Sequence, residues 1–181
     1  MLDYHCRNLS KEDEETIFNS YLKYGGFPRL LKFNDDKKIE YLTDSYYAII
    51  FREIVCNHNI RNFNLLESLI KFLIVNIGQR LSINSIKKHL KDENISVSTN
   101  TISTYLNYIT EAFIILKAKR KDLKTNKIVS TNEKYYCVDP GFYQLKSGIS
   151  KSKNQLLENI IFLELIRREY NVSMGKKNLN H

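Results

Sequence analysis

The chain has 181 residues, of which 43% are hydrophobic, and its 28 Lys and Arg against 20 Asp and Glu give a formal net charge of +8. This length suffices for one sizeable core, or for a small helical domain joined to a second module. No segment approaches the run of about 18 apolar residues that a membrane span needs, and the N-terminal residues lack the basic and then apolar pattern of a signal peptide. We therefore expect a cytoplasmic protein without a membrane partner, whose basic excess favours contact with phosphate groups.

Neither the cysteines nor the histidines have the spacing of a metal site. Cys6, Cys56 and Cys137 lie far apart, and the four histidines are equally scattered. This pattern predicts reduced cysteines, no disulfide framework and no bound metal. The G-x-x-x-x-G-K-[ST], G-x-S-x-G and H-E-x-x-H motifs are also absent from the sequence. We therefore expect no catalytic residues and no cofactor in this chain.

The first third of the chain is expected to be a small helical unit. Ser10 precedes a run of acids, and acidic residues in a first turn stabilise a helix through its dipole. This helix is expected to end at Gly25, and a long helix that Asp35 or Asp36 can cap follows it. We assign residues 1–63 to this helical domain.

Three shorter helices are expected next, because apolar residues recur at helical spacing in residues 65–77, 83–90 and 98–109. Ser82 precedes the second of these helices and Ser98 the third, each in the position of a helix cap. Three short helices, the last two joined by a tight connection, are typical of a helix-turn-helix.

A β-hairpin is expected to follow the third helix. Residues 113–119 and 134–138 are rich in β-branched and aromatic side chains, and the polar connection at 122–132 separates them. A hairpin in this place is a wing, so we assign residues 64–148 to a winged helix-turn-helix domain. The expected fold class is mainly α with a small β-hairpin.

The last segment, residues 149–181, is expected to contain one helix after a linker at 148–154. That helix is apolar on more than one face, which suits a helix that packs against something else. We expect it to be an orphan helix, the start of a truncated domain whose remainder would cover it. Its exposed apolar surface makes self-association, in the form of a homo-oligomer, an additional expectation.

Two groups of residues are candidates for contact with DNA. The outward face of the third helix carries short polar side chains able to reach phosphates or base edges, at Thr99, Asn100, Ser103, Thr104 and Asn107. The wing carries clustered basic side chains able to straddle a phosphate backbone, at Lys117, Lys119, Arg120, Lys121, Lys124 and Lys127. The alternatives are that the polar residues only cover an exposed helix or pack on a neighbouring domain, and that the wing is a solvated hairpin tip. Because the helix face has no Arg, it suits weak or shape-led binding better than tight sequence reading.

An ordered series of short motifs resembles a known family. Read alone, the first of them indicates only a break between helices. The series comprises Y-G-G-F-P at 24–28, Y-L at 41–42, F-R-E-I at 51–54, N-I-G at 76–78, S-T-N-T-I-S-T-Y-L at 98–106, K-Y-Y at 134–136, D-P-G at 139–141 and L-E-N at 157–159. In this order it is similar to the C-terminal half of prokaryotic AAA-type ATPases, which place a P-loop core first, then a helical lid, a winged helix and a domain that resembles PD-(D/E)XK nucleases.

The resemblance implies roles for individual residues. Gly26 and Pro28 look like the G-x-P motif of the lid, whose Pro would lie against the adenine of a nucleotide held by the ATPase core. Glu158 looks like the acid on the first helix of the nuclease-like domain. ATP and Mg²⁺ would be the cofactors of the full-length family, whereas this chain lacks the Walker motifs and the later nuclease strand.

Three functions follow from these observations. The leading hypothesis is a non-catalytic lid and winged-helix fragment of an AAA-type ATPase that binds DNA through the third helix and the basic wing. The second is a scaffold that packs on the missing ATPase core or on a protein partner. The third, an autonomous ATPase or nuclease, is disfavoured because the P-loop and the nuclease strand are absent.

Overall fold

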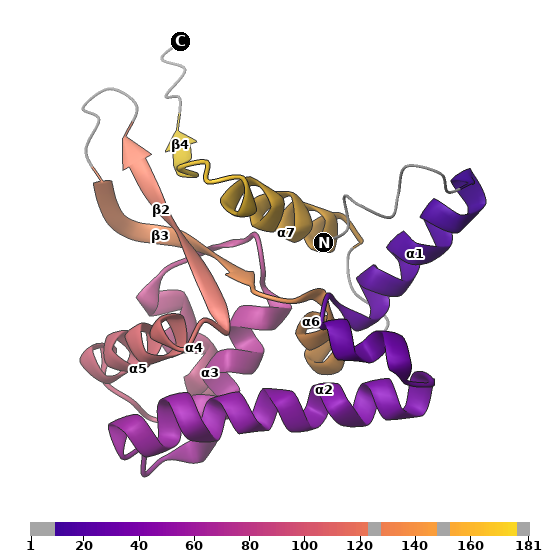
Figure 1. The fold of residues 1–181 in the computed structure, drawn as a ribbon. Helices are drawn as coiled ribbons and strands as arrows, with labels where there is room; N and C mark the ends of the chain where they lie inside the picture. Colours follow the sequence, from indigo (N-terminus) through magenta and orange to yellow (C-terminus); the bar gives the residue numbers. More distant parts are fainter. Residues whose placement is uncertain (1–9, 123–127, 148–152, 177–181) are drawn as a thin grey trace.

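A computed structural model describes residues 10–122, 128–147 and 153–176 of the chain (Figure 1). These residues form a mainly helical protein with a small four-stranded sheet. Among them, no helix combines the length and the apolar character needed to cross a membrane. The candidates Lys124 and Lys127 lie outside the described residues.

The N-terminal elements are helical, as the sequence predicts. They are α1 (Lys11–Tyr24), the 3₁₀ helix η3 (Pro28–Lys32), α2 (Asp35–Ile49) and the π-helical segment η4 (Ile50–Cys56) that continues α2. The Ser10 hydroxyl accepts a hydrogen bond from the Asp13 N–H, and the Asp13 carboxylate accepts one from the Ser10 N–H. This capping box accounts for the start of α1. The cap of α2 is Asn34 rather than Asp35 or Asp36, since its side chain accepts from the Lys37 N–H.

The three predicted short helices are confirmed. They are α3 (Phe63–Val75), α4 (Ile83–Asp92) and α5 (Thr99–Glu111). Ser82 and Ser98 cap α4 and α5, each accepting a hydrogen bond from the N–H three residues later. In Figure 1 these helices gather on one side of the hairpin, and α2 runs beneath them.

The sheet is larger than the sequence predicts. Its strands are β1 (Arg80–Leu81), β2 (Ile115–Asp122), β3 (Ile128–Cys137) and β4 (Met174–Lys176), in the order β1-β3-β2-β4. β2 and β3 pair antiparallel, and β4 adds to β2 in parallel. The polar connection expected at 122–132 is wrong at its C-terminal side, because β3 already begins at Ile128.

A helix that the sequence does not predict follows β3. It is α6 (Pro140–Ser147), and α7 (Lys153–Arg167) comes after it. The D-P-G sequence is typical of a turn, but Pro is also favoured at the first position of a helix, where no N–H is needed. Here the turn residues start α6, which packs against α1, α2 and α3.

One hydrophobic core joins all three predicted segments. It contains Leu22 of α1, Leu66 of α3, Phe142 of α6 and Leu156 of α7, together with the buried sides of α4, α5 and the hairpin. The helices α3–α5 and the helix α7 lie on opposite sides of the hairpin (Figure 1). The expectation of an orphan C-terminal helix is therefore wrong.

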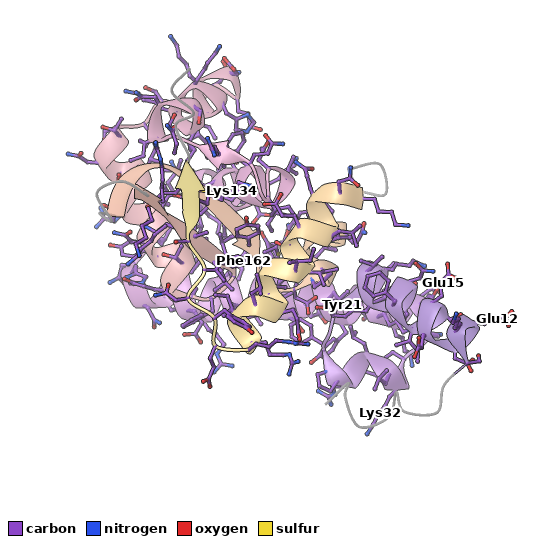
Figure 2. The ribbon with its side chains drawn as sticks, turned by 90° about the horizontal axis from the view of Figure 1, so that it is seen from above. Glu12, Glu15, Tyr21, Lys32, Lys134 and Phe162 are labelled. Atoms are coloured by element: carbon purple, nitrogen blue, oxygen red, sulfur yellow. The ribbon has the colours of Figure 1, made fainter. Side chains whose placement is uncertain are left out.

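The packing of α7 depends on Asn159, the one buried polar residue among those the structure describes. Its Oδ1 accepts from the Cys137 N–H at 2.7 Å, and its Nδ2 donates to the Cys137 carbonyl at 2.9 Å. Phe162 lies on α7 one helical turn later (Figure 2). Its ring stacks on Tyr136 with 3.9 Å between the ring centroids. Asn159 thus supplies hydrogen-bond partners for the Cys137 backbone, on the edge of β3 that β1 leaves unpaired beyond Lys134.

We expect Asn159→Ala to lower the free energy of unfolding by about 3 kcal/mol, because it leaves a buried N–H and a buried C=O without partners. Urea denaturation measures this change, and Asn154→Ala, on the exposed first turn of α7, is the matched control. Equal stability of the two variants would contradict the role of Asn159 as the anchor of α7.

Candidate nucleic-acid interface

The predicted polar face of α5 is at the surface. Asn100, Thr104 and Asn107 are exposed, whereas Thr99 and Ser103 are half-buried. The hydroxyl of Ser103 donates to the Thr99 carbonyl and that of Thr104 to the Asn100 carbonyl. These hydroxyls can therefore accept a hydrogen bond from a ligand, whereas the side-chain amides of Asn100 and Asn107 can both donate and accept.

The basic residues that the sequence assigns to a wing fall on two faces of β2. Side chains alternate along a strand, and Lys117, Lys119 and Lys121 together line a hollow of about 460 Å³ with the segment 171–173. Lys117 forms an ion pair with Glu133, at 3.4 Å. Within the described residues, Lys119 and Lys121 have no carboxylate within ion-pair distance. We name these three side chains the lysine row.

Arg120 does not belong to the lysine row. It shares the opposite face of β2 with Ala118 and Leu116, which pack toward Tyr136 and Phe162. Lys134 is also engaged, because its Nζ lies 2.7 Å from the Glu158 carboxylate. The basic cluster that the sequence suggests is thus divided between two faces of β2. The alternation of side chains along β2 is the sequence signal that separates Arg120 from the lysines.

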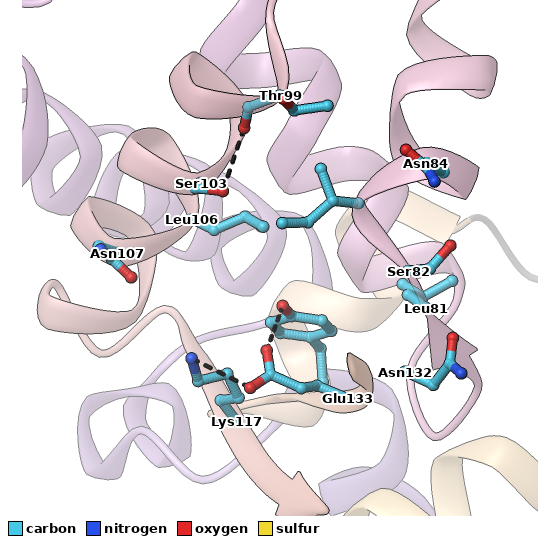
Figure 3. Close-up of a pocket in the computed structure, with 12 residues that line it drawn as sticks. Leu81, Ser82, Asn84, Thr99, Ser103, Leu106, Asn107, Lys117, Asn132 and Glu133 are labelled. Atoms are coloured by element: carbon cyan, nitrogen blue, oxygen red, sulfur yellow. Dashed lines mark hydrogen bonds and ion pairs between the residues drawn. The ribbon is translucent and has the colours of Figure 1, made fainter. Parts of the chain in front are cut away.

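A second hollow, of about 450 Å³, lies between α5, the start of α4 and the hairpin (Figure 3). We name it the α5–hairpin pocket. It brings together the predicted residues Thr99, Ser103, Asn107 and Lys117. Its other lining residues are Leu81, Ser82, Ile83, Asn84, Leu106, Asn132, Glu133 and Tyr135. Of the predicted face of α5, Asn100 and Thr104 do not line it.

Among the lining residues that the sequence did not single out, Glu133 is the charged one. Its side chain is only 16% exposed, and its carboxylate accepts a hydrogen bond from the Tyr135 hydroxyl at 3.1 Å and pairs with Lys117. Burial and this neighbouring carboxylate raise the pKa of Tyr135. The hydroxyl therefore stays protonated and continues to donate to Glu133.

An irregularity of β3 positions Glu133 and Asn132. Ala118 pairs with Lys134 but Arg120 pairs with Val129, so two steps along β2 are matched by five along β3. Asn132 lies in this bulge with a φ of 57°, in the left-handed region. Bulges of this kind re-aim side chains next to functional sites, and a register shift leaves no signal in the sequence.

The G-G-F-P turn contacts the D-P-G turn. The Asp139 carboxylate accepts from the Gly26 N–H at 2.8 Å and from the Gly141 N–H at 2.7 Å. Gly25 has a φ of 82°, and a Cβ on Gly141 would overlap the carbonyl of Tyr24. Both glycines are therefore required by the close approach of α1 to α6.

This contact bears on the nucleotide role that the resemblance implies for Gly26 and Pro28. The Gly26 N–H already donates to Asp139, so it does not fit a role as donor to a nucleotide. Pro28 is exposed, and its ring can still present an apolar face to an adenine. Only Pro28 fits the implied contact.

Glu158 has partners that fit a structural role. Its carboxylate accepts from Lys134 at 2.7 Å and from the Tyr136 hydroxyl at 2.8 Å. Partial burial raises the pKa of this carboxyl, but the bonds from Lys134 and Tyr136 outweigh burial and lower it below 4.5. These contacts fasten α7 to β3, as Asn159 does. Among the described residues no group of three or more His, Cys, Asp or Glu side chains could hold a metal ion.

A lowered pKa makes a pH-dependent contribution to stability. It is present above the ordinary pKa of Glu, 4.5, and is lost as the pH falls through the lower folded value. We therefore expect Glu158→Gln to be less stable than the unmodified chain at pH 7, and the difference to shrink as the pH falls below 4.5.

Urea denaturation at several pH values measures this difference. Because the carboxylate is partly exposed, salt should also reduce the difference. A stability difference that does not change with pH would show that the ion pair with Lys134 contributes nothing.

Comparison with known proteins places the chain in a family. Residues 15–153 match a family described as a domain of unknown function, DUF8612. The chain belongs to this family. No solved structure gives a significant match to this chain.

Two relatives are similar over almost all of the chain. An "Uncharacterized protein" of Haemophilus influenzae is 34% identical over 176 residues, which are 95% of this chain and 44% of that protein. "Uncharacterized protein MJ1544" of Methanocaldococcus jannaschii is 34% identical over 163 residues, which are 90% of this chain and 36% of that protein. The chain thus spans less than half the length of these curated relatives.

Proposed function

We propose that this chain is the lid and winged-helix part of an AAA-type ATPase, and that it binds DNA through α5 and the lysine row. In this proposal α3, α4 and α5 are the three helices of a helix-turn-helix, and β2 and β3 are its wing. The chain itself is non-catalytic, and the missing ATPase core supplies ATP and Mg²⁺.

The observation that carries the proposal is the placement of the lysine row beside the polar face of α5. The α5–hairpin pocket, in which both Thr99 and Ser103 of α5 take part, shares Lys117 with the hollow that Lys119 and Lys121 line. Polar groups that reach base edges and cations that neutralise phosphates are the two parts of a DNA-binding surface. The face of β2 that carries them is the one that α7 leaves uncovered.

The composition of this surface indicates its mode of binding. Its cations are lysines, which neutralise phosphates as point charges, and α5 presents no Arg for a bidentate contact with guanine. Binding is therefore expected to depend strongly on salt and weakly on the order of bases.

Adjacent residues on opposite faces of β2 give a matched test. We expect Lys119→Gln to weaken binding to a labelled duplex by about fivefold and to reduce the salt slope by about one, because it removes one phosphate contact. Arg120→Gln removes the same charge from the other face and should change neither quantity. Fluorescence anisotropy, titrated from low to physiological salt, measures both.

Two results would contradict the proposal. Absence of binding even at low salt would remove DNA as a partner. Equal effects of the two substitutions would show that only net charge matters and that the lysine row is not the contact surface.

The alternative function is a protein-interaction scaffold, and exposed apolar side chains favour it. Ile161 and Tyr170, on α7 and just after it, are each 60% exposed, and Leu31 of η3 is more exposed still. Such side chains suit contact with the ATPase core, with a protein partner or with a second copy in a homo-oligomer. If DNA does not bind, sedimentation at physiological salt separates self-association from a monomer that awaits its partner.

A further inference from the structure

We propose that the α5–hairpin pocket accepts one unpaired nucleobase of a DNA strand whose phosphates lie on the lysine row. This inference rests on the proposed function and specifies which form of DNA the surface prefers. It assigns a ligand-recognition role to Glu133 and Asn132, which duplex binding alone does not require.

The two hollows are adjacent and differ in chemistry. They share Lys117, and the hollow of the lysine row is otherwise lined by Lys119, Lys121 and the segment 171–173. A nucleotide has the same division, with a planar, hydrogen-bonding base at one end and an anionic phosphate at the other. A strand that crosses Lys117 can therefore place a base in the pocket and its neighbouring phosphates on the lysine row.

The pocket has the size and lining of a small-molecule site. Its volume of about 450 Å³ falls in the range of roughly 300–1,000 Å³ that is usual for ligand pockets. Leu81, Ile83 and Leu106 supply apolar surface for the faces of a ring. The amides of Asn84, Asn107 and Asn132 stand around it and can each donate and accept (Figure 3).

Glu133 gives the pocket a chemical preference. A carboxylate in a largely buried position is costly unless it is paired, and Lys117 and the Tyr135 hydroxyl supply this pairing. An ionised carboxylate has about four acceptor positions, so two partners leave room for a ligand. An acceptor of this kind favours a base with an amino group, as in adenine, cytosine or guanine. Thymine has one ring donor, N3–H, and the two carbonyl oxygens that flank it repel a carboxylate.

A fully paired duplex cannot use this pocket. Its bases are stacked, and enzymes that act on a base must first extrude it or bind it unpaired. Thr99 and Ser103 of α5 can still face a continuous duplex, but Glu133 and Asn132 would find no base to contact there. An unpaired base, in contrast, can leave the stack at a small energetic cost and enter.

Three labelled DNAs test the inference with the unmodified chain. They are a fully paired duplex, the same duplex with one extra unpaired adenosine, and the same duplex with an abasic nucleotide in that place. We expect the unpaired adenosine to improve affinity about tenfold over the paired duplex, as a few well-placed hydrogen bonds would. The abasic DNA, which is equally flexible and equally charged, should bind like the paired duplex.

The comparison separates this inference from the proposed function. Binding of all three DNAs with equal affinity would overturn the base pocket and leave duplex binding intact. Equal gains from the adenosine and the abasic nucleotide would overturn it too, since flexibility alone would explain them. Failure of all three to bind would overturn the proposed function itself.

A substitution tests the part of Glu133. An unpaired thymidine should gain less than an unpaired adenosine, and Glu133→Gln should bring the ratio of the two affinities close to one. The amide oxygen of Gln still accepts from the Tyr135 hydroxyl, so the fold is preserved. Glu40→Gln, on the exposed surface of α2, is the control and should keep the ratio, whereas an unchanged ratio in Glu133→Gln would remove Glu133 from recognition.

Discussion

The arrangement of the whole chain depends on the hydrogen bonds that the Asp139 carboxylate accepts. It stands at the end of β3 and accepts hydrogen bonds from the N–H groups of Gly26 and Gly141, which belong to the start of the chain and to α6. Burial raises the pKa of this carboxyl, and the two N–H donors act in the opposite direction by favouring its charged form. The carboxylate therefore joins the N-terminal helices to the hairpin at one point.

A second set of contacts, at Cys137 and Tyr136, holds α7 against the hairpin. Asn159 occupies the backbone groups of Cys137, and Phe162 stacks on Tyr136. These contacts cover one face of the hairpin with α7. The lysine row is left on the opposite face, next to α5, because side chains alternate along β2. The candidate interface is thus a consequence of where α7 packs.

The helices could be predicted because their signals are local. Ser10, Ser82 and Ser98 each cap the helix that the sequence assigns to them, and the apolar spacing of α3 and α5 matches their buried faces. The extent of the hairpin could not be predicted in the same way. β3 begins with Ile128 and Val129, but the polar run 130–134 separates them from the apolar end of the strand. One strand spans this polar run because β2 pairs with both parts.

The candidate site could be predicted only in part for the same reason. The polar face of α5 and the lysines of β2 follow from periodicity within single elements. The α5–hairpin pocket depends on three elements and on a bulge at Asn132 that only the pairing of β2 with β3 reveals. That Lys119 and Arg120 lie on opposite faces could also be predicted, once residues 115–122 are assigned to a strand.

Hydrogen exchange with and without duplex DNA is the measurement that tests the central claim most directly. If α5 and the lysine row form the interface, DNA should slow exchange in β2, in the first turn of α5 and in the segment 171–173, and leave α1 and α2 unchanged. Slower exchange confined to α1, η3 or α7, in a sample that binds DNA, would place the interface elsewhere and contradict the account.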